Sequence, residues 1–234
     1  VDLLHSVFII IIFLTIFSLQ TLAQDNNIKD ILKEHEFEIQ YLTTSLKDGN
    51  AEYFFDVKIS TTNGDKHNIE IAKFDPTKAV GERWILISVN NNTPSTDDFI
   101  KFNKAHNTQK SGVNGKIDAS SWTIVTNDSN YLVLIYRFDK STLPEKYEFL
   151  GDCKGLAYFN KKTKRLEKSE FVNESPLKVK IFKVDELDMV MYYEYISKDN
   201  TYVIEREVID MEGRLLGTKV TVKEVDDFSN YRKN

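Results

Sequence analysis

The pattern of apolar and polar positions first singles out the start of the chain. Val7 to Leu19 (VFIIIIFLTIFSL) is an almost unbroken apolar run, and small residues follow at Thr21 and Ala23. Its thirteen residues are fewer than the roughly 20 that a transmembrane helix needs. An apolar segment of this length before a small-residue cleavage site is typical of a secretory signal peptide. We therefore expect residues 1–23 to be a signal peptide and residues 24–234 to form one domain.

Helical periodicity occurs in two places. From Asn26 to Leu46, apolar residues recur at three- and four-residue spacing and predict an amphipathic helix. A second helix is expected after Pro94, where Ser95 is followed three residues later by Asp98 in the arrangement of a capping box. The second helix would bury one apolar face, made of Phe99, Ile100, Phe102 and Ala105.

The rest of the chain alternates with the period of two that is typical of strands, and Gly and Asn separate the segments. Two turn signals are Asn63-Gly64, expected at the centre of a tight hairpin, and Glu212-Gly213. Turns this short require antiparallel pairing. The expected strands are Ala51–Ser60, His67–Phe74, Trp84–Val89, Trp122–Thr126, Tyr131–Phe138, Tyr147–Asn160, Arg165–Val172, Leu177–Val184, Asp188–Ser197, Thr201–Met211 and Arg214–Val225.

Strand parity predicts a sheet with one dry face and one largely wet face. Between Met189 and Tyr195, one parity is apolar or aromatic, while the other includes Glu194. Trp84–Val89 is apolar on both faces, so we expect it to be covered on both sides. The fold class is therefore mainly β (α+β): a single curved antiparallel sheet of about eleven strands, a half-barrel, covered by two helices.

A curved sheet with a covered dry face can leave an apolar cavity. The alternative is that the same side chains form an ordinary packed core. The candidate cavity residues are Trp84, Leu86, Phe99, Phe102, Trp122, Met191, Tyr193 and Tyr195.

Composition narrows the function classes. Without residues 1–23, the chain has 211 residues with 31 Lys and Arg against 35 Asp and Glu, a net charge of −4. The single Cys153 excludes an internal disulfide framework. With a pI near 5.5 and one concentrated basic tract, from Lys161 to Lys168, nucleic acid is not an expected partner. That tract either meets an anionic membrane surface or an acidic partner, or it keeps a strand edge soluble.

Catalytic and metal-binding patterns are missing from the sequence. The His residues stand alone, without a Cys or His at metal-ligand spacing. We expect Cys153 to be a buried thiol, Asp97-Asp98 to mark a helix N-terminus and Asp226-Asp227 to lie in a solvated chain end. The sequence thus predicts no catalytic residues, no metal site and no cofactor. An unrecognised hydrolase would need a nucleophile beside a buried acid or His.

Several short motifs, taken in order, carry a family resemblance. They are Phe74-Asp75-Pro76, Gly81-Glu82-Arg83-Trp84, Pro94-Ser95 with Asp97-Asp98, Gly155-Leu156, Lys178-Val179-Lys180-Ile181, Gly213-Arg214 and Asp227-Phe228-Ser229-Asn230-Tyr231. This set resembles the LolA/LolB-like superfamily of exported bacterial proteins, which includes outer-membrane lipoprotein-sorting proteins. The resemblance implies a half-barrel closed by helices around an apolar cavity that shelters lipoprotein acyl chains. At Asn91-Asn92-Thr93 the chain departs from the family's small loop residues.

These observations leave two main hypotheses. The first is a non-enzymatic carrier that binds a lipid or a lipoprotein acyl chain, located in the periplasm, at the outer membrane or outside the cell. The second is an envelope interaction or scaffold module without a ligand cavity, which docks an envelope protein or a membrane surface through a sheet edge or the basic hairpin.

Overall fold

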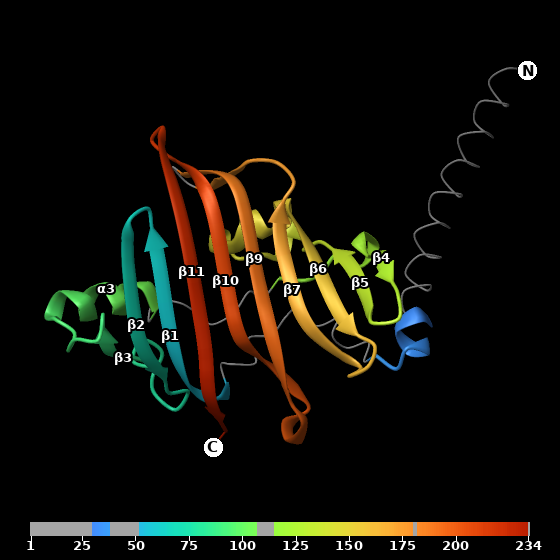
Figure 1. Cartoon of the computed structure of the whole chain (residues 1–234), viewed down its shortest axis with the longest axis horizontal. Helices are drawn as coiled ribbons and strands as arrows, with labels where there is room; N and C mark the ends of the chain where they lie inside the picture. The colour runs from blue at the N-terminus through green and yellow to red at the C-terminus, as the bar shows by residue number, and fades with distance from the viewer. Residues whose placement is uncertain (1–29, 38–51, 107–114, 180–181, 234) are drawn as a thin grey trace, which may run out of the picture.

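The computed structural model describes residues 30–37, 52–106, 115–179 and 182–233. Among these residues, eleven strands form one open antiparallel sheet (Figure 1). Its strands are β1 (Phe54–Asn63), β2 (Lys66–Phe74), β3 (Trp84–Val89), β4 (Thr123–Asn127), β5 (Tyr131–Tyr136), β6 (Cys153–Asn160), β7 (Arg165–Asn173), β8 (Leu177–Val179), β9 (Phe182–Ile196), β10 (Thr201–Leu215) and β11 (Thr218–Arg232). The fold class expected from strand parity is confirmed.

The last strand of the chain lies near the middle of the sheet. The strand order is β3-β2-β1-β11-β10-β9-β7-β6-β5-β4, with β8 beside β9. The first hairpin therefore joins the C-terminal strand, and Ile59 of β1 pairs with Asp226 of β11. This junction brings side chains from the two ends of the described sequence into the centre of one sheet.

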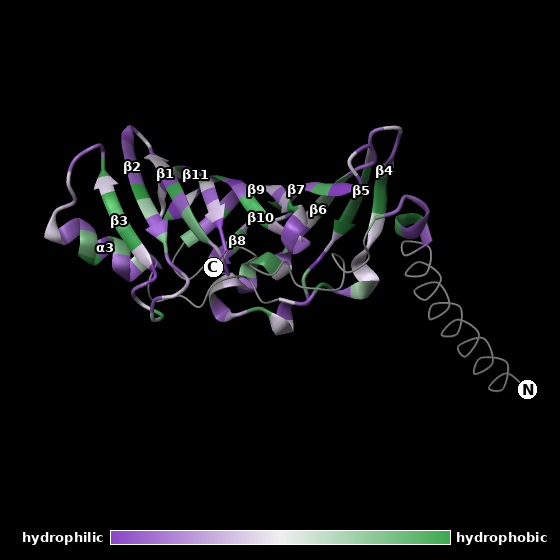
Figure 2. Cartoon of the chain, turned by 90° about the horizontal axis from the view of Figure 1, so that it is seen from below, coloured by the Kyte–Doolittle hydropathy of each residue, from purple (hydrophilic) through white to green (hydrophobic). Residues whose placement is uncertain are grey.

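The helices lie on one face of the sheet (Figure 2), which we call the inner face; the opposite face is the outer face. α3 (Thr96–His106) covers the β1–β3 end. η3 (Lys140–Thr142) and η4 (Glu145–Asp152) lie behind the central strands in the view of Figure 1. The predicted capping box is confirmed, because Ser95 Oγ accepts a hydrogen bond from Asp98 N at 3.2 Å and the Asp98 carboxylate accepts one from Ser95 N at 2.9 Å. None of the described helices has the length and hydropathy that crossing a bilayer would require.

The predicted helices are only partly described or only partly correct. The structure shows a helical turn at residues 30–34; the rest of the expected helix at 26–46 and the expected signal peptide at 1–23 lie outside the described residues. The expectation that α3 buries a broad apolar face is wrong. Phe102 is buried, but Phe99 is 41% and Ile100 60% exposed, because α3 lies at the end of the sheet and packs against it through Phe102.

β3 was expected to be covered on both sides, and this expectation is also wrong. It is an end strand of the sheet, and Ile87 on it is 45% exposed. Trp84 and Leu86, which share one parity, pack on the α3 side, whereas Ile87 on the other parity is exposed.

Several strand boundaries and both predicted turns differ from the sequence expectations. Residues 147–152 belong to η4, not to a strand, because Tyr147, Phe149 and Leu150 pack as a helical turn against the sheet. The expected strands at 177–184 and 188–197 are instead the short β8 and the long β9, which continues through a bulge.

The expected turn at Glu212-Gly213 lies inside β10, and the chain turns at Leu216-Gly217. In the first hairpin, Asn63 still pairs with Lys66, so the central turn residues are Gly64 and Asp65, and Gly64 has φ +56°.

Gly213 tolerates its position in the strand because it has no side chain. A Cβ there would stand 2.3 Å from the backbone oxygen of Lys183. The register between β9 and β10 shifts at this point, so Gly213 marks a close approach of two strands instead of a turn.

Candidate ligand-binding face

The described residues form three apolar clusters, and two of these contain candidate cavity residues. We call these two the β5–β9 cluster and the β1–β3 cluster. The first is built on Leu132, Leu134, Tyr136, Ala157, Phe159 and Phe171 with Trp122 and Leu150. The second is built on Phe55, Val57, Ile59, Ala72, Phe74 and Leu86 with Phe102 of α3.

The candidate cavity residues divide between these clusters. Trp122, Met191 and Tyr193 contribute to the β5–β9 cluster, whereas Trp84, Leu86 and Phe102 contribute to the β1–β3 cluster. Phe99 lies on the exposed side of α3. Tyr195 lies near the end of β9, 5.0 Å from the Tyr202 ring and 3.6 Å from the Arg165 guanidinium. The structure thus brings these residues together as two groups of three, with Phe99 and Tyr195 outside both.

An aromatic layer forms the floor of the β5–β9 cluster. The Tyr136 ring lies 4.9 Å from Trp122 and 5.7 Å from Phe171. It crosses Gly155 so closely that a Cβ on that glycine would stand 2.8 Å from Tyr136 Cζ. Glycine at position 155 therefore lets the tyrosine reach across β6 toward β7.

Three hydroxyl groups meet within this apolar layer. The hydroxyls of Tyr136 and Ser169 are buried and make no hydrogen bond to any residue in the described part of the chain. Tyr193 contacts Met191 Sδ at 3.9 Å, a weak acceptor. Ser169 lies near enough to both tyrosines to lower their pKa, but burial has the larger effect and raises the pKa of each well above its usual value. Neutral hydroxyls in a dry layer can orient a polar atom of a bound molecule, because leaving each of them unsatisfied costs about 1–3 kcal/mol.

The side of this cluster nearest to β10 is partly exposed and rich in adaptable side chains. Met189, Met191 and Tyr193 of β9 and Tyr202 of β10 pack against the buried core without being buried themselves. Methionine fits irregular apolar shapes through its flexible, polarisable thioether. This part of the inner face is therefore the best candidate for contact with an apolar chain.

A row of carboxylates crosses β2, β11 and β10 on the inner face. Glu70 and Asp226 both lie across from Ile59, and Glu207 lies across from Asp226 in the next strand pair. Glu224 faces Thr61, which donates a hydrogen bond to its Oε2 at 3.0 Å. We call these four residues the carboxylate row.

Asp226 is the most perturbed member of the carboxylate row. Its Oδ1 is buried and has no hydrogen-bond partner among the residues described. Burial raises the pKa of Asp226 to about 8, and the negative charges of Glu224 and Glu207 contribute. Burial likewise raises the pKa of Glu70. The expectation that Asp226-Asp227 forms a solvated chain end is wrong for Asp226, because β11 continues through it into the centre of the sheet; Asp227 lies on the outer face, 3.5 Å from Arg206.

The sequence pattern does not predict the carboxylate row, because the parity of one strand does not show which strands lie next to it in the sheet. Asp226 does share the parity of Phe228, and Ser169 shares the parity of Phe171. A polar residue among the apolar residues of one strand face was therefore the only sequence signal for a buried polar group. The gathering of four acids depended on the pairing of β1 with β11, which no local pattern specifies.

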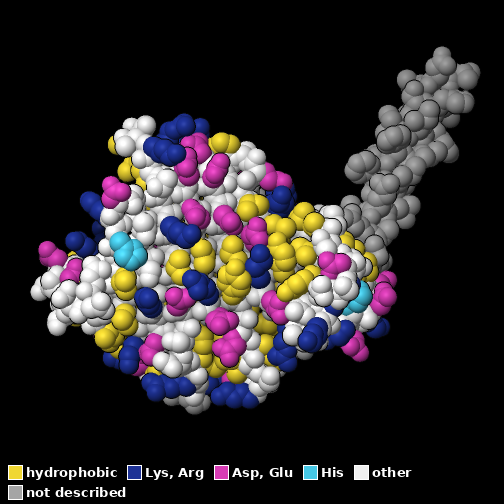
Figure 3. Space-filling view, viewed as in Figure 1, with side chains coloured by type: hydrophobic (Ala, Val, Ile, Leu, Met, Phe, Trp, Pro, Cys, Tyr) yellow, Lys and Arg dark blue, Asp and Glu magenta, His cyan; other side chains and the backbone are white. Residues whose placement is uncertain are grey.

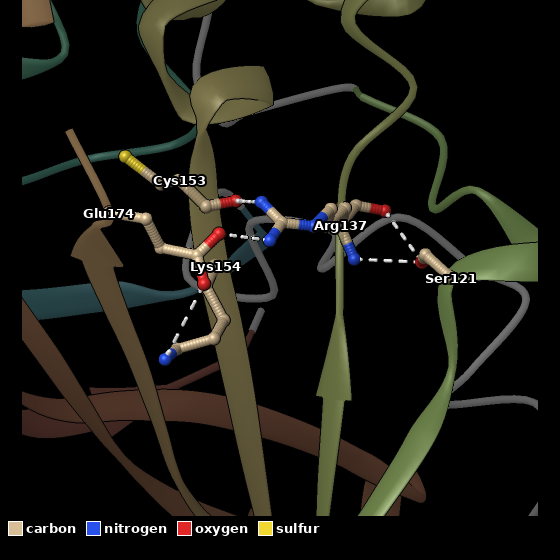
Figure 4. Close-up of polar contacts among 5 residues, drawn as sticks. All are labelled: Ser121, Arg137, Cys153, Lys154 and Glu174. Atoms are coloured by element: carbon tan, nitrogen blue, oxygen red, sulfur yellow. Dashed lines mark hydrogen bonds and ion pairs between the residues drawn. The ribbon is translucent and has the colours of Figure 1, made fainter.

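A serine, an arginine and a cysteine meet at the edge of the β5–β9 cluster (Figure 4). Arg137 donates its backbone N–H to Ser121 Oγ at 2.8 Å and a guanidinium N–H to the Cys153 carbonyl at 3.4 Å. It also pairs with Glu174, whose pKa it lowers, and Glu174 lies 3.8 Å from Lys154. These contacts tie the start of β4, the end of β5, the start of β6 and the turn after β7 together.

This constellation does not provide an activated nucleophile. Burial raises the pKa of Cys153 to about 11, and its sulfur points away from Arg137 (Figure 4). Ser121 Oγ donates to the Asp118 carbonyl at 2.6 Å. Cys153 is thus a buried free thiol, as expected. Within the described ranges, no three His, Cys, Asp or Glu side chains are placed to hold a metal ion.

Searches with protein-family models and against curated protein sequences found no match. Two solved structures are similar to the chain. One is a LolA superfamily protein from Nitrosomonas europaea, at 14% identity, 81% of this chain, 89% of that chain and a TM-score of 0.36. The other is a DUF1329 family protein from Desulfovibrio piger, at 11% identity, 88% of this chain, 91% of that chain and a TM-score of 0.36. The first belongs to the superfamily that the sequence motifs resemble; at such low TM-scores, we take the fold from the strand pairings and infer no function from either likeness.

Proposed function

We propose that this chain is an exported, non-enzymatic binding protein that carries an amphiphile, such as a lipid or the acyl chains of a lipoprotein, on its inner face. The observation that supports it is the partly exposed group of Met189, Met191, Tyr193 and Tyr202 beside a buried aromatic layer. An apolar chain laid along this group would remove apolar surface from water on both partners, at about 25 cal/mol per Å².

The polar groups around this surface suggest which head group the ligand carries. The hydroxyls of Tyr136, Ser169 and Tyr193 suit an uncharged acceptor such as an ester or amide carbonyl. Glu207 and Glu224 of the carboxylate row disfavour an anionic head group on the β10 side, since like charges repel strongly in a partly buried setting. A neutral acyl ester or acyl amide therefore fits better than a free fatty acid.

Native mass spectrometry of the protein purified without detergent tests this proposal. A co-purifying lipid, or saturable binding of a fluorescent acyl ester, is the expected result. A fluorescent fatty acid of the same chain length serves as the matched probe and should bind more weakly at neutral pH. If no lipid co-purifies and neither probe binds, the proposed function is wrong.

A second candidate function is a protein-interaction module, favoured by the edge of the sheet at β3. There, Ile87 on the end strand is 45% exposed, and Phe99 and Ile100 on the adjoining α3 are 41% and 60% exposed. An edge strand beside apolar side chains can accept an added strand from a partner. This candidate predicts that Ile87→Lys abolishes cross-linking to an envelope protein and leaves acyl-ester binding unchanged.

A further inference from the structure

The turn between β10 and β11 projects beyond the neighbouring hairpins at one end of the sheet (Figure 1). Its residues include the most exposed large apolar side chain among those described, Leu216, which is 83% exposed; the preceding Leu215 is 39% exposed. Two adjacent leucines therefore stand at the tip of a protruding hairpin, in contact with water.

The backbone of this turn makes leucine an unusual choice. Leu216 has φ +51° and Gly217 has φ +86°. A two-residue hairpin turn with positive φ at both positions favours Asn-Gly, and a leucine rarely adopts the left-handed region. Leu216 also contributes little to the core, since most of its surface is exposed. Neither turn formation nor packing explains a leucine here.

A basic row lies directly behind the leucines on the outer face. Lys178, Lys183, Arg214 and Lys219 pair in register across β8, β9, β10 and β11. The Arg214–Lys219 pair is adjacent to the Leu215–Thr218 pair that closes the hairpin.

Acidic residues neighbour this basic row but lie mainly behind it. Asp185 is 3.4 Å from Lys183 and 3.6 Å from Arg214, and Glu212 is 2.6 Å from Lys219. Glu212 and Glu186 pair with each other two residues further from the tip than Arg214. Basic side chains accordingly gather at the end of the molecule where this turn projects, with acidic ones below them (Figure 3). Behind the leucines, a surface that approaches the tip therefore meets the basic row before the acidic residues.

The basic hairpin between β6 and β7 lacks the exposed apolar tip that the β10–β11 turn has. Its Lys161 Nζ is 2.6 Å from Asn127 Oδ1, and Lys164 Nζ is 3.6 Å from Glu36. Among the described residues, no exposed large apolar side chain stands at its tip. The β6–β7 hairpin thus has basic residues alone, whereas the β10–β11 turn combines basic residues with exposed leucines.

We propose that the β10–β11 turn docks this chain on an anionic phospholipid bilayer, with Leu215 and Leu216 inserted among the acyl chains and the basic row against the phosphates. Strands rise about 3.4 Å per residue, so Arg214 and Lys219 stand roughly 3–7 Å behind the tip. This matches the depth of about 5–10 Å to which interfacial apolar side chains enter a membrane. Because the whole chain has a net charge of −5, attraction to such a surface depends on this local arrangement. The docking is independent of the amphiphile proposed for the inner face.

Fluorescence of a tryptophan at the tip tests the docking. The full chain with Leu216→Trp is mixed with vesicles of phosphatidylglycerol and phosphatidylcholine, some of the lipid being brominated, and the signal of the unchanged chain is subtracted. Ile100→Trp is the matched control, since Ile100 is an exposed apolar residue on α3, far from the turn. The tip tryptophan should shift to the blue and be quenched on the anionic vesicles, while the control should not change.

Two further variants test the chemistry. Leu216→Asn suits the turn and should weaken vesicle binding about tenfold or more, and Arg214→Gln should weaken it about fivefold. The proposal is overturned if the tip tryptophan is not quenched on anionic vesicles, or if pure phosphatidylcholine quenches it equally. A blue shift that grows with protein concentration without vesicles would instead identify a second copy as the partner, and would also overturn it.

Discussion

The ring of Tyr136 lies directly over Gly155, 2.8 Å from the place a Cβ would occupy. This contact lets an aromatic side chain from β5 span β6 and reach the Phe171 ring on β7. It also positions the Tyr136 hydroxyl in the apolar layer that we propose as the ligand-binding face.

Gly155→Ala should therefore disturb the aromatic layer. The added methyl group displaces the Tyr136 ring, and overpacking of this kind costs about 1–3 kcal/mol. Chemical denaturation of the variant should show this loss. In a double-mutant cycle with Tyr136→Leu, the loss should be much smaller, because the shorter side chain does not cross residue 155. Strictly additive effects would contradict the contact.

Tyr136→Phe should stabilise the protein in the absence of ligand. The variant removes a buried hydroxyl that has no hydrogen-bond partner among the described residues, so the free energy of unfolding should rise by about 1 kcal/mol. Tyr131→Phe is the matched control: the Tyr131 hydroxyl donates to Glu167 at 2.9 Å, and its loss should lower stability by a similar amount. Equal destabilisation by both variants would show that the Tyr136 hydroxyl has a partner.

Asp226 should make the protein less stable in alkaline solution. Its pKa is about 8 in the folded chain against an ordinary value of 3.8, so the folded chain holds this proton more tightly than the unfolded chain. The free energy of unfolding should consequently fall as the pH rises from about 4 to about 8 and then level off.

Asp226→Asn isolates this effect. The variant should gain about 1–3 kcal/mol over the unchanged protein at pH 9 and little at pH 4. Asp227→Asn is the control, because Asp227 lies on the outer face beside Arg206 and should show no comparable gain. A pH profile that Asp226→Asn leaves unchanged would contradict the burial of this carboxylate.

Local chemistry made much of the sheet predictable. Alternation in Cys153–Asn160 corresponds to alternating buried and partly buried positions, and the Ser95–Asp98 capping box begins α3 as expected. The strand alternation and the capping box each depend on residues that are close together in sequence. A short segment therefore contains all the residues that determine the structure.

The failures came from contacts that are distant in sequence. The sequence pattern predicted a turn at Gly213, but this glycine instead lets the backbone of Lys183 on the neighbouring strand β9 approach closely. Leu216 does not resemble a turn residue, yet it takes the left-handed turn position. The carboxylate row depends on the pairing of β1 with β11, which are the first and last of these strands in chain order and neighbours in the sheet.

The central claim is that an apolar chain binds to the inner face beside Met191, and Met191→Glu compared with Val190→Glu tests it most directly. The two residues are neighbours on β9, both partly buried, but Met191 lies on the inner face and Val190 on the outer face. Both variants are first checked for native thermal unfolding, and each is then titrated with a fluorescent acyl ester. We predict that Met191→Glu weakens binding at least about tenfold and that Val190→Glu leaves it unchanged. Equal binding by the two variants would contradict the claim.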